Sequence, residues 1–448
     1  MSYRRILLAA LGGALAATIW MWRPAQAPNW SPAEVSQIES LWIENLPPLP
    51  VDPTNAVADD PDAAEFGHAL FFDTRLSANG AIACATCHQP IRHFSDGLRK
   101  GVALGMSKRN TPSIVGTAYS PWLYWDGRRD SLWSQALSPL EDPNEHGSDR
   151  MQIVRTVQEA ADLRRTYEDV FGPMPDFSDP RRFPDKAAPS INAEHTAAWR
   201  SMTAADRTTV NRVFSNLGKA LAAYERRLVP APARFDEYAA AVAKGDKPAQ
   251  RSTLSAEEAF GLRLFIGKAR CTECHNGPLF TNNEFHNTGI LSAPGDLPDR
   301  GRSEGLRLVR NDPFNCAGAY SDAPEPYCAE LDFAREGIEL IGAVRTPSLR
   351  NLQNTAPFMH RGQLDTLLEI VEHYDEAPLA MIGHNEAKPL SLSGRERRAL
   401  VAFLQTLFSP PAADERWLAA PALVHGARPA FAEASPRKRS TDATAQNQ

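Results

Sequence analysis

Residues 66–88 begin with Phe66-Gly67-His68-Ala69-Leu70-Phe71-Phe72 and end with Cys84-Ala85-Thr86-Cys87-His88. A related stretch begins with Phe260-Gly261-Leu262-Arg263-Leu264-Phe265-Ile266 and ends with Cys271-Thr272-Glu273-Cys274-His275. Each Cys-X-X-Cys-His segment has the spacing of a c-type haem attachment site, in which the histidine is the proximal iron ligand. A zinc site would need four protein ligands and gives no reason for a histidine directly after each second cysteine. The repeat therefore predicts two related domains, each with one covalently bound haem.

The repeat continues downstream of both segments. Arg109-Asn110-Thr111-Pro112-Ser113 resembles Arg345-Thr346-Pro347-Ser348, and Trp125-Asp126-Gly127 corresponds to His360-Arg361-Gly362. We therefore expect one cytochrome c-like domain over 28–240 and a second over 254–409. A Pro-containing, charged stretch at 241–253 is the expected linker, and 291–340 is expected to be an insertion in the second domain.

The fold class follows from composition and from helix-start signals. Of 448 residues, 43% are apolar and 23% are charged, as in a soluble globular protein, and 36 are proline, which favours long irregular connections. Capping-box patterns begin at Ser31, Ser255, Thr366 and Ser393. Few segments alternate with period two. A mostly α fold with long loops is expected, with further helices at 61–72, 128–138, 151–170 and 203–228.

Charge excludes one class of partner. The formal net charge is −6 and the isoelectric point is about 6.0, so no global basic field is present to hold a phosphate backbone. Nucleic acid is therefore not an expected partner.

Both termini differ in composition from the body of the chain. Arg4 and Arg5 precede an apolar run at 6–22, and small residues follow at 25–27. This pattern predicts a signal peptide over 1–27, or an uncleaved anchor as the only membrane attachment, and hence a periplasmic protein. The Pro/Ala-rich end at 410–448 is expected to be unstructured.

Two cysteines remain, Cys316 and Cys328, and both lie in the expected insertion. In an oxidising compartment they are expected to form a disulfide that holds the insertion together.

Two attachment sites in tandem related domains of an exported chain resemble the bacterial dihaem cytochrome c peroxidase/MauG family. The resemblance extends from Ala64 to Phe408, outside the insertion. It implies that the first haem reacts with peroxide, beside a tryptophan that lies between the two haems and a distal pocket with Gln and Glu. Trp125, Gln135 and Glu145 match these positions. A carboxylate can move a proton between the peroxide oxygens while a polar neighbour orients the peroxide.

The same resemblance implies how each iron is ligated. The peroxidases carry a blocking histidine in the loop after the first haem, and 101–105 has none, so the first haem is expected to be five-coordinate. At the second haem, the distal ligand follows the histidine of an Ala-Pro-aromatic-X-His segment by fourteen residues and is Met in peroxidases but Tyr in MauG-like enzymes. Ala356-Pro357-Phe358-Met359-His360 leads to Tyr374, which indicates the MauG-like branch, with Met359 and Met381 as weaker rival ligands.

Family members also bind one calcium ion between the domains, through an asparagine side chain and two backbone carbonyls. Asn110, Thr355 and Pro357 match these positions, and oxygen donors suit this hard cation. Arg361 replaces the usual aspartate after His360.

The resemblance implies a dihaem c-type peroxidase or oxidase. It would use hydrogen peroxide to reach a high-valent dihaem state and oxidise a partner protein by long-range electron transfer, with a tryptophan of that partner as one candidate target. His146 and the insertion are similar to features of the subgroup associated with methanobactin operons. Two alternatives stay open: a peroxidase that reduces peroxide to water with electrons from a small cytochrome or copper protein, and a non-catalytic dihaem electron carrier.

Overall fold

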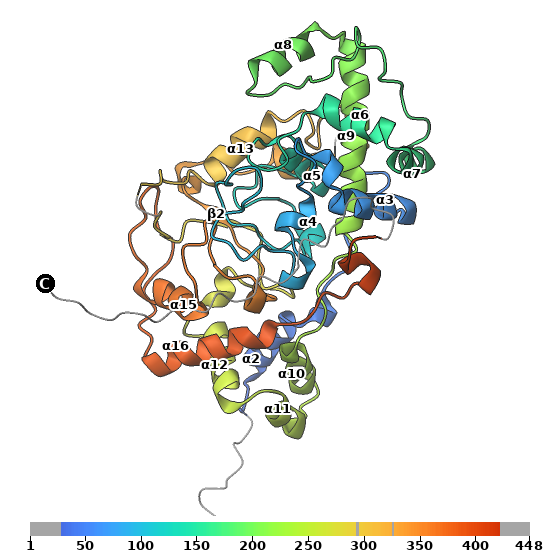
Figure 1. Ribbon diagram of the computed structural model, residues 1–448. Coiled ribbons are helices and arrows are strands. Elements are labelled where there is room, and N and C mark those ends of the chain that lie inside the picture. The colour runs from blue at the N-terminus through green and yellow to red at the C-terminus, as the bar shows by residue number, and fades with distance from the viewer. Residues whose placement is uncertain (1–27, 293–294, 325–326, 422–448) are drawn as a thin grey trace, which may run out of the picture.

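The computed structural model describes residues 28–292, 295–324 and 327–421, so the expected signal or anchor segment at 1–27 lies outside the described residues. The described chain is helix-rich (Figure 1), and its one sheet pairs β1 (Phe285–His286) with β2 (Val344–Arg345) in antiparallel register. The expectation of a mostly α fold is confirmed. Within these described ranges, no helix combines the length and the apolar character that crossing a bilayer requires.

The first core is built around the long helix α9 (Ala204–Glu225), which packs against α3 (Pro61–Phe72) and α5 (Leu132–Glu141). Gly67 explains the close approach of α3 to α9, because a Cβ at this position would collide with the carbonyl oxygen of Ala220. The glycine of the first repeat is therefore a packing contact between two backbones.

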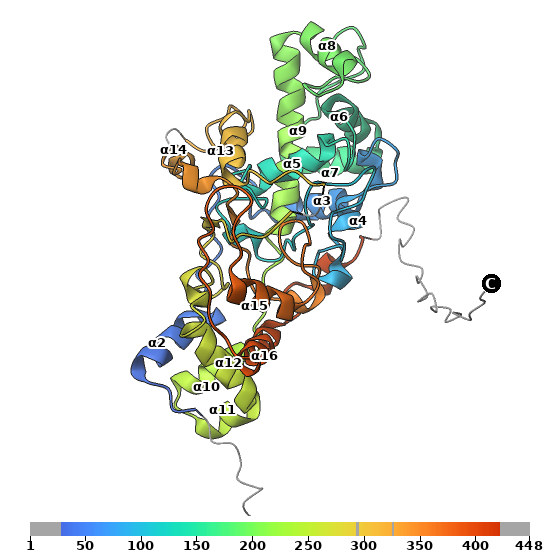
Figure 2. The ribbon, with the colours of Figure 1, turned by 90° about the vertical axis from the view of Figure 1, so that its left-hand side faces the viewer.

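The second core repeats this arrangement. It contains α2 (Pro32–Ser40), α10 (Arg234–Ala243), α12 (Ala256–Ile266) and α16 (Gly394–Leu404). Gly261 of α12 lies against the carbonyl oxygen of Ala399 in α16, again with no space for a Cβ. Figure 2 shows α9 and α8 (Ala193–Ser201) at one end of the molecule, and α10 with α11 (Lys247–Thr253) at the other.

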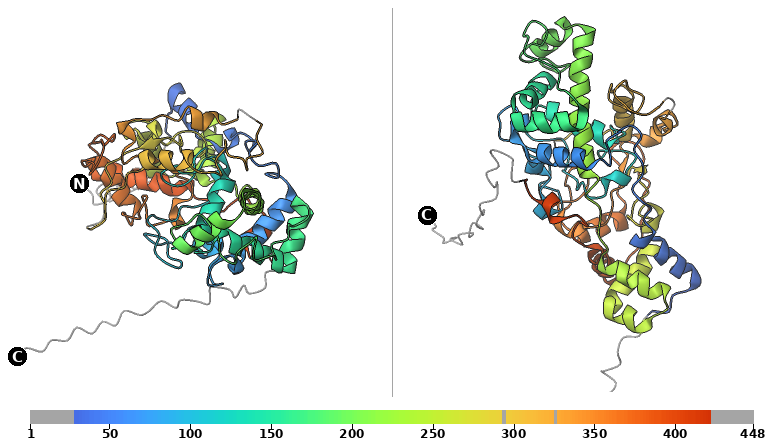
Figure 3. Two further views of the ribbon diagram at one scale, coloured as in Figure 1. Left: turned by 90° about the horizontal axis from the view of Figure 1, so that it is seen from above. Right: turned by 90° about the vertical axis from the view of Figure 1, so that its right-hand side faces the viewer.

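The cores do not follow the expected domain boundaries. The stretch 241–253, expected to be a linker, contains the end of α10 and all of α11, whose N-cap Asp246 accepts from the backbone N–H of Ala249. Pro248 lies in the first turn of α11, where a missing N–H costs no helical hydrogen bond. The residues of α2 pack in the second core, beside α10, although they precede the first repeat (Figure 3).

The prediction that 410–448 lacks structure is wrong for 410–421; residues 422–448 lie outside the described range. Trp417 is buried in the first core, next to the rings of His68 and Tyr224. The Tyr224 hydroxyl donates to the Trp417 carbonyl at 2.7 Å. One buried aromatic side chain therefore orders a segment whose composition resembles that of a disordered tail.

Local signals set most helix starts. The four predicted capping boxes form at α2, α12, α16 and α15 (Leu367–Glu376). The helix expected at 128–138 is α5, which starts later because Ser131 is its N-cap. The stretch 151–170 holds two helices, α6 (Arg150–Glu159) and α7 (Ala161–Phe171). Shorter elements are α4 (Cys84–Cys87), α13 (Arg302–Arg310), α14 (Ala329–Asp332), and the 3-10 turns η1 (Ile43–Asn45), η2 (Thr74–Leu76), η3 (Pro90–Arg92), η4 (Thr117–Tyr119), η5 (Cys271–Glu273), η6 (Ile338–Leu340), η7 (Leu352–Asn354), η8 (Gln405–Leu407) and η9 (Glu415–Leu418).

The insertion forms a third, small core with Trp122 of the first half. Cys316 and Cys328 form a disulfide with a Cα–Cα distance of 5.5 Å, as the sequence predicts. The insertion is also attached to the segment that follows Trp125. Arg129 pairs with Asp312 at 2.8 Å, and the Cys316 backbone N–H donates to Asp130 at 2.8 Å.

Candidate haem sites

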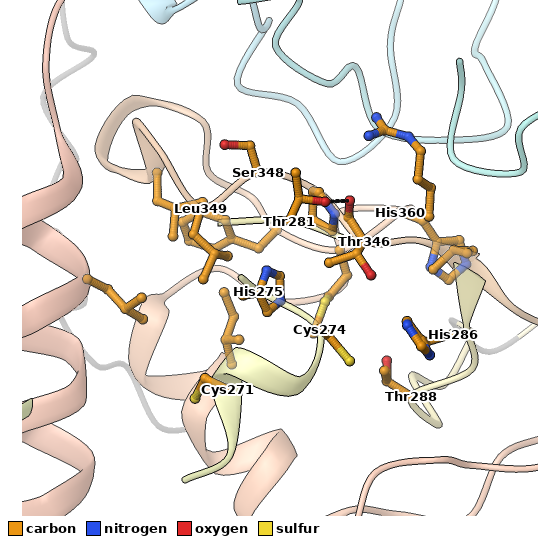
Figure 4. Close-up of a pocket in the computed structure, with 18 of the residues that line it drawn as sticks. Cys271, Cys274, His275, Thr281, His286, Thr288, Thr346, Ser348, Leu349 and His360 are labelled. Atoms are coloured by element: carbon orange, nitrogen blue, oxygen red, sulfur yellow. Dashed lines mark hydrogen bonds between the residues drawn. The ribbon is translucent and has the colours of Figure 1, made fainter. Parts of the chain in front are cut away.

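The second Cys-X-X-Cys-His segment lies on a large cavity. Cys271, Cys274 and His275 line a space of about 450 Å³, and Tyr374 of α15 lines the same space. Figure 4 shows the three residues of the attachment segment on one stretch of chain, with His286, Thr288 and His360 approaching from another side. The structure thus places the two predicted iron ligands, His275 and Tyr374, on one cavity, although they are 99 residues apart in the sequence.

Both attachment histidines are oriented in the same way by the backbone. His275 Nδ1 lies 2.9 Å from the Phe280 carbonyl oxygen, and His88 Nδ1 lies 3.0 Å from the Phe94 carbonyl oxygen. This hydrogen bond places the proton on Nδ1 and leaves Nε2 as the free lone pair, which is the usual arrangement of a metal-binding histidine. Phe94 and Phe280 are both fully buried and both have positive φ, so the repeat extends to the residues that supply the carbonyls.

Tyr374 sits in an apolar environment. Burial raises the pKa of its phenol to about 12, and a hydrogen bond with Thr288 acts in the opposite direction. The set of two thiols, an imidazole and a phenol fits a covalently attached haem with histidine and tyrosine as iron ligands. Of the two rival ligands, Met359 lines the same cavity, whereas Met381 lines a separate small one and is half exposed.

Around the first attachment segment, Gln135 and Glu145 lie in and just after α5. Burial raises the pKa of Glu145 to about 7, and the nearby Arg128 acts in the opposite direction. The charge of Glu145 also acts on the thiols of Cys84 and Cys87, which places this carboxyl near the attachment cysteines. Glu145 is therefore poised to exchange a proton near neutral pH.

Two neighbours of this pocket were not predicted as site residues. The hydroxyl of Tyr124 hydrogen-bonds with Gln135, and the guanidinium carbon of Arg128 lies 3.4 Å from the centroid of the Tyr124 ring. His146, next to Glu145, is 3% exposed and its Nδ1 has no hydrogen-bond partner among the described residues. Burial lowers the pKa of His146 to about 4, so this imidazole is neutral at physiological pH. No spacing rule identifies Tyr124, because its contact depends on a backbone with positive φ.

Trp125 belongs to the first half of the chain but lies at the cavity of the second attachment segment, called the second cavity below. It lines that cavity, its indole N–H donates to the Asn110 carbonyl at 3.0 Å, and its ring centroid lies 6.5 Å from that of His360. The Trp125 carbonyl accepts from the Arg345 backbone N–H at 2.7 Å. The Asn110 contact therefore fixes the indole within the first half, and the Arg345 contact joins the Trp125 backbone to the second half.

The residues expected to bind calcium also meet. The Asn110 side-chain amide lies 3.3 Å from the Pro357 carbonyl oxygen, and Asn110, Thr355 and Pro357 all line the same cavity. The same amide nitrogen donates to the Leu98 carbonyl at 2.8 Å, so binding a hard cation through Oδ1 would require the amide to turn and give up this hydrogen bond. Arg361 lies 3.5 Å from Asp299 and 3.7 Å from Asp296.

Comparison with known proteins agrees with this geometry. The family model for di-haem cytochrome c peroxidase matches residues 61–244. The methylamine utilization protein MauG of Methylorubrum extorquens is 33% identical over 79% of this chain and 80% of its own length. The cytochrome-c peroxidase IdrP2 of Denitromonas iodatirespirans is 32% identical over 80% of this chain and 84% of its own.

Solved structures show the same fold. A MauG-like protein associated with microbial copper homeostasis superposes with a TM-score of 0.55 at 26% identity, covering 85% of this chain and 98% of that one. The diheme peroxidase BthA of Burkholderia thailandensis superposes with a TM-score of 0.58 at 24% identity, covering 84% of this chain and 92% of that one. Sequence identity over four-fifths of both chains, together with this shared fold, shows that the protein belongs to the family of dihaem cytochrome c peroxidases and MauG, which are haem-dependent oxidoreductases.

Proposed function

We propose that the chain is a MauG-like dihaem enzyme that uses hydrogen peroxide to oxidise a partner protein. Family membership implies two haems, held here by Cys84, Cys87 and His88 in one half and by Cys271, Cys274 and His275 in the other. Tyr374 would supply a ligand to the iron of the second haem. The observation that carries the proposal is the presence of Tyr374, His275 and Trp125 on one cavity.

The bound haems supply the redox chemistry with peroxide, and the protein supplies proton transfer, orientation and the connection between the sites. Glu145 takes the proton from one peroxide oxygen on a carboxylate oxygen and returns it to the other, which its raised pKa permits near neutral pH. Gln135 is oriented by a hydrogen bond with the Tyr124 hydroxyl, which also feels the charge of Glu145, and its amide is assigned to orient the peroxide.

Trp125 connects the two halves. Its indole has its N–H fixed by a carbonyl and its ring at the edge of the second cavity, so it needs little rearrangement to transmit charge. The second haem would fill the cavity beside Trp125, so a partner protein is oxidised from a distance.

A partner-protein substrate is supported by the identity to MauG and by the tyrosine at position 374. The likeness to a MauG-like protein associated with copper homeostasis supports the related subgroup and a tryptophan of the partner as the oxidised group. The second candidate function is reduction of peroxide to water with electrons from a small redox protein, which the identity to IdrP2 favours. A raised carboxyl pKa beside the attachment cysteines argues against a purely electron-carrying protein.

Three further points belong to this proposal. One calcium ion binds between the halves through Asn110, Thr355 and Pro357. Each of the two cores adjoins one attachment segment, and each segment carries one haem. The chain is exported to the periplasm by the segment at 1–27, which acts as signal peptide or anchor.

Electron paramagnetic resonance of the ferric holoprotein tests the proposal. One high-spin and one low-spin signal are expected, from an open first haem and a His/Tyr-ligated second haem. Two low-spin signals would reject the open peroxide site. Incubation with peroxide and candidate partners, followed by peptide mass spectrometry, distinguishes a modified tryptophan from turnover of an electron donor.

A further inference from the structure

Arg345 is a cation that lines the second cavity without a protein carboxylate to balance it. It ends β2, and its guanidinium contacts only neutral groups in the described chain: the Ser120 hydroxyl at 3.3 Å and the Asn283 side-chain oxygen at 3.2 Å. Its Nε is buried and has no hydrogen-bond partner among the described residues. The residue is half-buried and lines the cavity.

Two other arginines in this part of the molecule are neutralised by carboxylates. Arg109, in the related motif of the first half, contacts Asp126 at 2.6 Å and Asp299 at 2.7 Å. Arg350, five residues after Arg345, pairs with Asp236 at 2.8 Å. Arg302, which is 3% exposed, also lacks a carboxylate partner in the described chain, but it donates to the Gly127 carbonyl at 2.6 Å and lies over the rings of Trp122 and Phe285. Arg345 differs from all three because it lines the cavity and no carboxylate faces it among the described residues.

An unpaired buried guanidinium is unfavourable, and it cannot escape by losing its proton. Burial lowers the pKa of Arg345 to about 10, which still leaves it protonated at neutral pH. Buried charges in proteins are paired or coordinated, because the loss of hydration is otherwise uncompensated. The missing counter-charge must therefore come from whatever fills the cavity.

We propose that Arg345 binds a propionate carboxylate of the second haem. The two propionates are the only carboxylates of a c-type haem, and a guanidinium offers a planar fork that matches a carboxylate. This inference rests on the proposed function only in placing a haem in this cavity. It assigns Arg345 as a positioning residue whose charge also acts on the iron.

The position of Arg345 gives this contact a second consequence. Its backbone N–H donates to the Trp125 carbonyl at 2.7 Å, while its side chain reaches Ser120 of the same first-half segment. One residue thus fixes the propionate edge of the second haem relative to the tryptophan between the halves. Loss of the side chain loosens the haem relative to Trp125 without touching an iron ligand.

The test is the midpoint potential of each haem, measured by spectroelectrochemistry of the holoprotein. A nearby positive charge favours the reduced haem, so Arg345→Gln is expected to lower the potential of the second haem and leave the first unchanged. Arg270→Gln is the matched control. Arg270 also borders the cavity, but it is half exposed and pairs with Glu273 at 2.7 Å, so its loss should shift the potential far less. Equal shifts in the two variants, or none in Arg345→Gln, would overturn the proposal.

Arg345→Lys covers the case in which the glutamine variant does not fold. Lysine keeps the positive charge but lacks the planar guanidinium. The midpoint potential of the second haem should therefore be close to that of the wild type. The propionate bending band in the resonance Raman spectrum should still shift relative to the wild type. An unshifted band would overturn the contact. If the midpoint potentials shift as expected but the wild-type holoprotein oxidises no partner protein, the Arg345 contact stands and the proposed function is rejected.

Discussion

Gly261 of α12 lies against the carbonyl oxygen of Ala399 in α16, and the corresponding glycine of the first repeat, Gly67, lies in the same way against Ala220. The two contacts show that the conserved element of the internal repeat is a helix crossing, and that each crossing carries a haem attachment segment at its end. A methyl group at either glycine has to push two backbones apart.

The first prediction concerns this crossing. Gly261→Ala should destabilise the holoprotein by about 1–3 kcal/mol or more, because a close-packed backbone contact relaxes poorly. Gly394→Ala, at the open start of α16, is the matched control and should be neutral or stabilising by about 0.4–1 kcal/mol. Denaturant unfolding followed by circular dichroism provides the comparison. Equal stability of the two variants would show that α12 and α16 can separate without cost.

The second prediction concerns Glu145. Glu145→Gln should slow the reaction with peroxide by roughly 10²–10⁴-fold, because the amide cannot exchange a proton. The exposed Glu159→Gln in α6 should have no effect. Stopped-flow measurement of the second-order rate constant decides between them. A rate within twofold of the wild type would remove Glu145 from the proton-transfer step.

The third prediction is the pH dependence that the same residue produces. Since the carboxylate is the proton acceptor, the wild-type rate should rise with pH through about 7, and the rise should be absent in Glu145→Gln. The free energy of unfolding depends on pH in the opposite direction to the rate. The folded state favours the protonated carboxyl, so its contribution is complete below the ordinary value of 4.5 and is lost as the pH increases through about 7. A pH series of unfolding midpoints for both proteins checks this second trend.

The fourth prediction separates the candidate ligands of the second iron. Tyr374→Met should raise its midpoint potential by an amount on the order of 0.1 V or more, because a thioether favours ferrous iron and a phenolate favours ferric iron. Met359→Leu, which alters the rival ligand on the same cavity, should leave the potential unchanged. The reverse pattern would assign the iron to Met359.

The fifth prediction concerns calcium. Asn110→Ala should lose calcium binding in calorimetric titrations of chelator-treated protein, whereas Asn276→Ala, an exposed amide next to the second attachment segment, should retain it. Because the Asn110 carbonyl accepts the Trp125 indole N–H, chelation should also change the electronic spectrum of the second haem. Unchanged binding in Asn110→Ala would relocate the cation.

The sequence predicts the fold where the signal is local. Capping boxes at Ser31, Ser255, Thr366 and Ser393 all form, because they involve only residues three apart. The position of Tyr374 on the cavity with His275 also follows from a motif with fixed spacing. These features depend on neighbours in the chain or on a repeated pattern.

Features that depend on long-range packing could not be predicted in this way. Trp417 is ordered by His68 and Tyr224, which are far from it in sequence, so its Pro/Ala-rich surroundings predict disorder. The stretch 241–253 has the composition of a linker but gains helix through its cap and through packing beside α10. The sequence places Arg345 in a repeated motif, but only the structure shows that no carboxylate faces it in the described chain.

The two ends of the described chain are exchanged between the cores. The N-terminal helix α2 completes the core of the later half, and the segment around Trp417 completes the core of the earlier half. Neither half can therefore be excised as a self-sufficient cytochrome, since a cut between α10 and α12 would strip each fragment of a wall that the other supplies. Folding must accordingly place α2 and the segment around Trp417 in opposite cores before the spacing between the two attachment segments becomes fixed.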